Sequence, residues 1–237
     1  EGQDFPGWIY SAALMALIVT ILVLQPDIGM TLMIVLTWGF QMFLAGMPML
    51  LVICIVALAP LGLVVAYFTL GHVHKRINQF WEGGAWQVEK ARDSFANGGL
   101  FGVGPGDGTV KHHLPDAHSD FIFAVAGEEF GALACLTLLT LYAFIVLRGF
   151  SRAMSDEGLF CLIASASLLL QFGVQAAIHM ASSVHLIPTK GMTLPLISYG
   201  GSSLVASGLT MGLILALTRR RAPYVLPGRR NLQEASS

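Results

Sequence analysis

The sequence predicts an all-α integral membrane protein, a polytopic bundle of transmembrane helices with one large extracytoplasmic loop. Of its 237 residues, 55% are hydrophobic and 11% are charged, and the mean hydropathy is +0.70. Soluble domains carry about 25% charged residues, so too little polar surface would be left here to cover a core. The charges are also segregated, because Asp27 is the only one between Trp8 and Leu70.

Six apolar segments are long enough to cross a bilayer as helices. A hydrocarbon core of ~30 Å requires about 20 helical residues. The six segments are residues 8–25, 30–46, 48–70, 120–148, 157–185 and 202–218. Pro26 ends the first, Asp27 can cap the second, and Gly46-Met47-Pro48 predicts a tight turn before the third. Pro60 predicts a kink inside the third segment.

Two segments do not fit a simple crossing. Residues 120–148 are long for one span, and Gly131 after two acids predicts a short, half-embedded helix from Asp120 to Phe130 that faces a water-filled cavity. Residues 186–201 contain two prolines and three glycines, which preclude a regular helix. Irregular backbone at membrane depth persists only where it is buried in protein or lines a cavity.

Basic residues predict the orientation. Arg219, Arg220 and Arg221 directly follow the last apolar run, and the side of the membrane rich in Lys and Arg is the cytoplasmic one. Six crossings put both ends of the chain on that side, so the polar loop 71–119 faces outward. Residues 1–221 then form the transmembrane domain, and residues 222–237 form a cytoplasmic tail.

Asp120 is the leading functional candidate, because a charge at a membrane boundary is costly unless it is used. Asp116, His118 and Asp120 alternate where the polar loop meets the fourth apolar run. This pattern could gather acid, base and ligand functions, or form a metal site, although loops also hold many solvated acids. Three residues so close in sequence seldom complete a metal shell, so no protein metal site is predicted.

The glycine-rich stretch 98–109 has two interpretations. Its backbone amides could approach an anionic group such as a diphosphate, or the glycines could simply form tight turns. Glu128 could share a cavity with Asp120, or one of Glu128 and Glu129 could serve as a structural clamp paired with Arg or Lys. Lys190, the only charge between Leu159 and Thr218, requires either an acid from elsewhere or an anionic ligand.

Cysteine and histidine residues in the apolar runs favour packing roles. Cys54, Cys135 and Cys161 are widely spaced and odd in number, which argues against a disulfide framework and a zinc site. His179 and His185 are expected to be hydrogen-bonded interior residues.

Three motifs, in order, resemble the SEDS family of bacterial membrane proteins, which serve shape, elongation, division and sporulation. They are QPDIG at 25–29, GVGPGDGTVKHHLPDAHSDFIFAVAGEEFG at 102–131 and PTKGMTLPLISYGGSS at 188–203. The residues of the second and third motifs are most similar to those of the division branch of the family. The resemblance covers essentially the whole chain and implies a ten-helix bundle, of which this chain would hold the last six helices.

The resemblance further implies a peptidoglycan glycosyltransferase that polymerises lipid II in the bacterial inner membrane. The family's essential acid corresponds to Asp120, its PTKG lysine to Lys190 and its serine-rich turn to Ser198–Ser203. Asp120 is expected to act as general base, or to hold Mg²⁺ or Mn²⁺ on the diphosphate. The residues expected to contact substrate are Lys190, Lys111, Arg92, His118, Glu128 and Ser198.

Two other functions stay open. One is transport of lipid-linked precursors as a flippase, because broken helices and a lone intramembrane lysine also suit transporters. The other is a scaffold that binds a class B penicillin-binding transpeptidase and other division proteins. No basic patch of the nucleic-acid-binding type is present.

Overall fold

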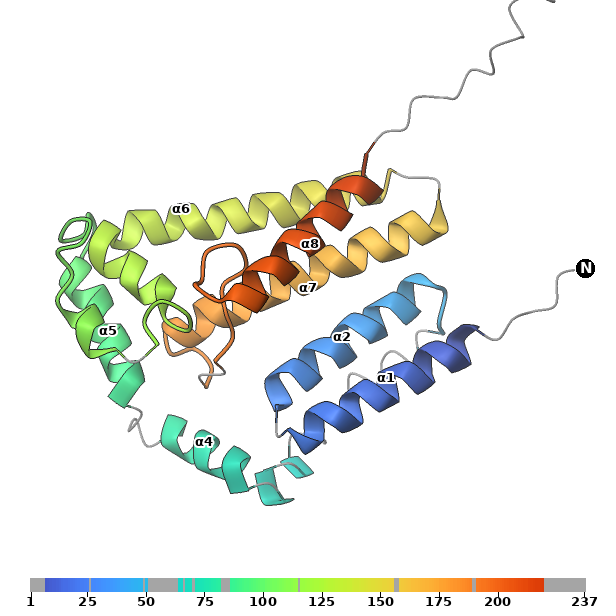
Figure 1. The fold of residues 1–237 in the computed structure, drawn as a ribbon, viewed down its shortest axis with the longest axis horizontal. Coiled ribbons are helices and arrows are strands. Elements are labelled where there is room, and N and C mark those ends of the chain that lie inside the picture. Colours follow the sequence, from blue (N-terminus) through green and yellow to red (C-terminus); the bar gives the residue numbers. More distant parts are fainter. Residues whose placement is uncertain are drawn as a thin grey trace, which may run out of the picture.

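The computed structural model describes residues 7–25, 27–48, 50, 64–65, 67–69, 71–81, 86–114, 116–155, 158–188 and 191–219. In these ranges the chain is helical and contains no strand (Figure 1). Its elements are α1 (Gly7–Leu24), α2 (Ile28–Leu44), α4 (Gly71–Trp81), α5 (Trp86–Gly98), the short 3₁₀ helix η1 (Val110–His113), α6 (Ile122–Ala153), α7 (Leu159–Ser183) and α8 (Gly201–Leu217).

Three helices, α1, α6 and α7, are long and apolar enough to cross a membrane, and α2 and α8 are shorter apolar helices. None of the residues of α1 is buried, although its hydropathy is 2.2. An apolar helix with exposed side chains is stable in lipid, where its backbone groups are satisfied internally. The predicted all-α membrane fold is therefore confirmed. The segment 48–70, including Pro60, lies mostly outside the described residues.

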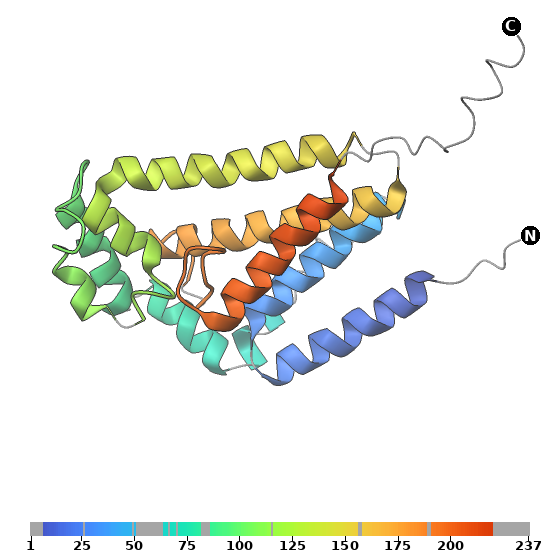
Figure 2. The ribbon, with the colours of Figure 1, turned by 45° about the horizontal axis from the view of Figure 1, so that its top comes forward.

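The helices pack as a layered bundle around α7. This helix contacts α2, α6 and α8, while α1 packs on α2 (Figure 2). A core cluster joins α6, α7 and the segment after α7 through seven residues: Phe123, Cys135, Tyr142, Phe172, Ala176, Met180 and Leu194. Cys135 is buried in this cluster, as its expected packing role requires. Cys161 is half-buried, and Cys54 lies outside the described residues.

The two ends of the bundle differ in character. The start of α1 and the end of α8 lie at the same end of the bundle (Figures 1 and 2). The other end carries α5, residues 184–188 and 191–200, and the turn between α1 and α2. In that turn, the Asp27 carboxylate caps α2 by accepting a 3.0 Å hydrogen bond from the Met30 amide, as predicted.

Helix α6 is broken at Gly131, which has φ 79° and ψ 179°. The predicted short helix before the long crossing is therefore confirmed, and it runs from Ile122 to the break. Residues 186–188 and 191–200 contain no helix, which confirms the second predicted irregularity.

Residues 71–119 were predicted only as a polar loop, but the structure forms the helices α4, α5 and η1 there. Helix α5 packs on α6 through Ala91, Ser94 and Gly98, which are buried at helical spacing. Phe95 adds an edge-to-face contact with Phe123, with ring centroids 5.9 Å apart. The face of α5 that packs on α6 consists of small residues. The sequence of α5 therefore lacks the stripe of large apolar side chains by which an amphipathic helix is predicted.

Candidate functional site

Asp120 closes a tight turn directly before α6. The carbonyl of Asp116 accepts hydrogen bonds from the amides of Ser119 (3.0 Å) and Asp120 (2.9 Å). The next residue, Phe121, is buried in a cluster with α5, and Phe123 is buried in the cluster with α7. The backbone that carries the Asp120 carboxyl is thus anchored on two sides.

The segment after α7 is hydrogen-bonded to this turn. The Ser198 hydroxyl donates to the Ser119 carbonyl (2.7 Å) and accepts from the Leu194 amide (2.7 Å). The Tyr199 amide donates to the His118 carbonyl (2.9 Å). Ser198 is only 4% exposed, so its observed role is to join the two segments. Its direct contact with a substrate stays a prediction.

The Asp120 carboxyl is half-buried and faces Gly191. A Cβ atom added to Gly191 would lie 3.3 Å from the Asp120 Oδ2, so only glycine leaves this face of the carboxyl open. Burial raises the pKa of the Asp120 carboxyl above its ordinary value, and the nearby charge of Asp116 adds to this rise. Among the described residues, no basic side chain forms an ion pair with Asp120.

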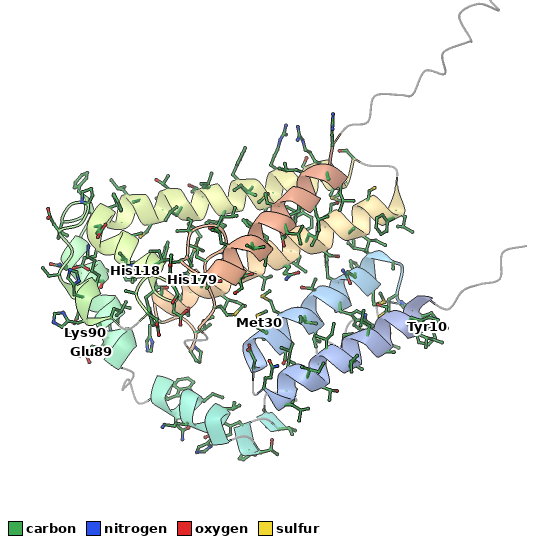
Figure 3. The ribbon with its side chains drawn as sticks, viewed as in Figure 1. Tyr10, Met30, Glu89, Lys90, His118 and His179 are labelled. Atoms are coloured by element: carbon green, nitrogen blue, oxygen red, sulfur yellow. The ribbon has the colours of Figure 1, made fainter. Side chains whose placement is uncertain are left out.

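A cavity of about 360 Å³, lined by both polar and apolar groups, lies between α2, α7 and α8, and Gly191 forms part of its wall. It is lined by Asp27, Met30, Gln171, Phe172, Gln175, Gly191, Met192, Thr193, Pro195, Ser202, Ser203, Ala206, Ser207 and Thr210. The Gln175 amide donates to the Thr193 carbonyl (3.0 Å), and the Thr193 and Ser203 hydroxyls lie 2.5 Å apart. Met30 marks the α2 side of this space in Figure 3. Amides, hydroxyls and one carboxylate suit a ligand rich in hydroxyl or amide groups.

Glu128 is 0% exposed and is held by four donors. Its Oε1 accepts from the Asn97 side chain (2.9 Å) and from the amides of Thr109 and Val110 (2.8 Å each), and its Oε2 accepts from the Lys111 amide (2.9 Å). The amides of the glycine-rich stretch and η1 therefore do approach an anion, but that anion is the chain's own carboxylate. The clamp predicted as an acid paired with Arg or Lys is formed by Glu129, which pairs with Lys111. Glu128 is also a structural clamp, but its partners are neutral amide groups.

The other predicted substrate contacts fall in different settings. Lys111 forms an ion pair with Glu129 and donates to the Gly106 carbonyl (3.0 Å), so its ammonium group already has partners. Arg92 on α5 and His118 beside Asp120 are exposed and accessible to a ligand. Lys190 lies outside the described residues.

The predicted divalent cation has only a partial set of protein ligands here. Within the described parts of the chain, no three side chains of His, Cys, Asp or Glu come together in a group that could hold a metal ion. Mg²⁺ is often bound by one or two carboxylates together with substrate phosphates. Asp120 could supply one such ligand, and a cation on the diphosphate stays a prediction.

Sequence reasoning assigned no function to His179 or to most of the cavity wall. His179 is fully buried and hydrogen-bonded to the Met192 carbonyl, as an interior histidine should be. Its position beside the Asp120 turn arises because residues 191–200 fold back against α7. A signal was present in Gln171 and Gln175, two amides four residues apart on an apolar helix.

Most of this chain matches a known family of proteins. The sequence profile of the FtsW, RodA and SpoVE family, described as cell cycle proteins, matches residues 3–222. The chain belongs to this family. The SEDS resemblance predicted from the three motifs is therefore confirmed.

Relatives within the SEDS family agree with this assignment. The chain is 42% identical over 224 residues to the "Probable peptidoglycan glycosyltransferase FtsW" of Caulobacter vibrioides, covering 93% of this chain and 57% of that protein. It is 32% identical over 206 residues to the "Peptidoglycan glycosyltransferase RodA" of Mycobacterium leprae, covering 84% and 44%. The chain thus spans about half the length of the curated relatives it matches.

A solved structure has a similar fold. It comes from work on polymerization and crosslinking by a peptidoglycan synthase complex. The match has a TM-score of 0.69 and 27% identity, and it covers 90% of this chain and 62% of that one. Together with the apolar helices, this likeness makes the chain a multi-pass membrane protein.

Proposed function

We propose that this chain carries the catalytic acid–base site of a peptidoglycan glycosyltransferase that polymerises lipid II into glycan strands during cell division. The observation that carries the proposal is the Asp120 carboxyl: anchored, half-buried, free of an ion pair among the described residues and open toward Gly191. The names of the FtsW and RodA relatives support the reaction class.

The chemistry requires a base near the acceptor sugar. The acceptor hydroxyl attacks the anomeric carbon of the lipid-linked donor while the bond to the diphosphate breaks. Asp120 takes the hydroxyl proton, and a raised pKa suits this task because the base then binds the proton more strongly. The cations proposed to offset the charge that develops on the diphosphate are Arg92, which is exposed, and Lys190, which lies outside the described residues.

The proposed setting is the bacterial inner membrane, with both termini in the cytoplasm and the Asp120 end of the bundle outside. The proposed partner is a class B penicillin-binding transpeptidase, together with other division proteins. The synthase complex of the structural relative supports such a partnership. No nucleic-acid partner is proposed.

The decisive variant is Asp120→Asn in the protein at its full natural length. General-base catalysis contributes about 10²–10⁴-fold in rate, so we expect glycan polymerisation from purified lipid II to fall by that factor, with folding retained. Product length and amount on a denaturing gel measure the loss.

Asp116→Asn is the matched control, because it changes a carboxylate of the same turn. Asp116 is exposed and has φ 53°, a conformation that asparagine tolerates. We expect this variant to keep most of the polymerisation rate. Polymerisation by Asp120→Asn at the level of the unmutated protein would contradict the proposal.

The cavity between α2, α7 and α8, which is lined in part by polar side chains, would also suit a flippase. Vesicles that contain the protein and fluorescent lipid II separate the two functions. Glycan strands support the polymerase, whereas exchange of lipid II between leaflets, seen as altered protection from dithionite, without any polymer supports transport.

A further inference from the structure

His179 on α7 has one satisfied and one unsatisfied ring nitrogen. Its Nδ1 lies 2.6 Å from the Met192 carbonyl oxygen, and because a carbonyl only accepts, Nδ1 carries the proton. In the neutral ring Nε2 is then an acceptor. Nε2 is buried and has no hydrogen-bond partner among the described residues. A buried polar atom without a partner requires an explanation in a native structure.

The Gly191–Met192 segment brings His179 next to Asp120. The Asp120 Oδ2 lies against Gly191, and the His179 ring is hydrogen-bonded to the following residue, Met192. Asp120 and His179 are close enough to interact electrostatically, and a positively charged His179 ring would lower the pKa of the Asp120 carboxyl. A neutral ring with its proton on Nδ1 has no such charge and acts on Asp120 only through Nε2. Figure 3 shows His179 beside the turn that carries His118, two residues before Asp120. The other groups that act on the Asp120 carboxyl are Ser119 and Asp116.

Building on the proposed function, we propose that His179 is a positioning residue for Asp120, whose Nε2 accepts a hydrogen bond from the Asp120 carboxyl when that carboxyl holds the acceptor sugar's proton. The hydroxyl O–H bond breaks as its oxygen bonds to the anomeric carbon. The bond from that carbon to the diphosphate oxygen breaks, and its electron pair leaves with the diphosphate. The proton passes to Asp120, and the new O–H group points at Nε2.

This role explains why the imidazole is kept in one tautomer. The bond from Nδ1 to Met192 fixes the ring and leaves Nε2 free of hydrogen, so it can only accept. A fixed acceptor holds the protonated carboxyl in one orientation, and it favours the proton-bound form of the pair over a lone carboxylate. The unprotonated carboxylate has no proton to share with Nε2, and the lone pairs of the two acceptors repel each other, so the protonated carboxyl is the favoured form beside this ring.

The test compares two substitutions at position 179 in the protein at its full natural length. In His179→Asn the side-chain amide can still donate to the Met192 carbonyl, but no atom reaches the place of Nε2. In His179→Gln the longer side chain can put its carbonyl oxygen there. We expect kcat for lipid II polymerisation to fall about tenfold in His179→Asn, equivalent to one hydrogen bond, and to recover in His179→Gln.

The pH profile separates positioning from a structural role. Polymerisation is lost as the pH falls and the base becomes protonated. Because Nε2 stabilises the proton-bound pair, its removal should shift the acid limb of kcat/KM to lower pH in His179→Asn, and His179→Gln should shift it back. A purely structural defect would lower the rate at every pH and would leave the pH of the acid limb of kcat/KM unchanged.

His185→Asn is the matched control at the end of the same helix. His185 has φ 62°, which asparagine adopts readily, and it does not contribute to the electrostatics of Asp120. We expect an unchanged rate and acid limb. Thermal unfolding and gel filtration check folding of all variants.

The outcomes distinguish this inference from the proposed function. If Asp120→Asn is inactive while His179→Asn keeps the normal rate and acid limb, the role of His179 is overturned and that of Asp120 stands. The role of His179 is also overturned if both position-179 variants have a low rate and the acid limb of kcat/KM stays at its normal pH. Normal polymerisation by Asp120→Asn overturns the proposed function itself.

Discussion

Glu128 shows how one buried carboxylate can order a long polar segment. Three consecutive amides, from Thr109 to Lys111, converge on it at the start of η1, and Asn97 reaches it from the end of α5. These bonds satisfy both carboxylate oxygens, so the charge is stable in a site with no solvent exposure. The glycine-rich stretch is therefore held by an anion built into α6.

This clamp predicts that Glu128→Gln destabilises the protein. The substituted amide must face one of the donors that the carboxylate accepted, so a buried N–H loses its partner at a cost of about 1–3 kcal/mol. We expect a lower thermal unfolding midpoint. Hydrogen exchange should also quicken at the amides of Thr109, Val110 and Lys111.

The matched control is Asp93→Asn, the same change in an ion pair on α5. Lys90 and Asp93 lie 2.8 Å apart with side chains 32% and 47% exposed, and exposed pairs contribute about 0–1 kcal/mol. Asp93→Asn should leave the unfolding midpoint nearly unchanged. Equal midpoints for the Glu128 and Asp93 variants would refute the clamp.

At the level of elements, the break in α6 and the glycine-rich stretch are complementary. The break frees backbone groups, and the stretch provides their partners. The carbonyls of Glu128 and Glu129 accept from the amides of Val103 (3.0 Å) and Gly104 (3.1 Å). Beyond the break, the Ala132 amide donates to the Gly99 carbonyl (2.9 Å). Such pairing allows a helix to break without leaving its backbone groups unsatisfied.

Gly131→Ala should disrupt this junction. With φ 79° and ψ 179°, Gly131 occupies a region that is essentially restricted to glycine, and the strain alone costs about 1–3 kcal/mol. An added Cβ would also overlap the Leu100 carbonyl and the Gly102 amide, which are backbone and cannot turn aside. We expect a large loss of folded protein in detergent, measured by gel filtration and thermal unfolding.

Gly212→Ala is the control for this substitution. Gly212 lies within α8, and a Cβ there meets no atom within 4 Å. Alanine is favoured over glycine inside a helix by about 0.5–1 kcal/mol, so this variant should be as stable as the unmutated protein or slightly more so. A Gly131→Ala variant of equal stability would show that the junction is not constrained.

The parts that could be predicted from sequence were those set by local chemistry. The apolar runs, the Asp27 cap, the irregular segment before α8 and the short helix before Gly131 each follow from neighbouring residues. The Glu128 clamp and the His179 position could not be predicted, because both depend on segments that meet only in the folded bundle. Ser198 and Ser119 are 79 residues apart in sequence, and nothing local indicates that they are hydrogen-bonded.

At the scale of the whole molecule, the anchored carboxyl and the cavity both adjoin one residue, Gly191. Gly191 lines the cavity and also faces Asp120, so a ligand that fills the cavity could reach the base at this glycine. Five of the lining groups are carried by α8, so its packing against α7 sets the width of the space.

Ser207→Leu tests whether the cavity holds the substrate. Ser207 is 7% exposed and lines the cavity, whereas a side chain on its neighbour Gly208 would meet open space. Leucine at 207 should occupy part of the 360 Å³ and raise the KM for lipid II about tenfold, or ~1.4 kcal/mol of binding, while leucine at 208 should not. The two variants add the same side chain to adjacent positions of one helix, so a general effect on α8 would alter both. An equal KM for both variants would mean that the reacting sugars reach Asp120 by a route that avoids this cavity.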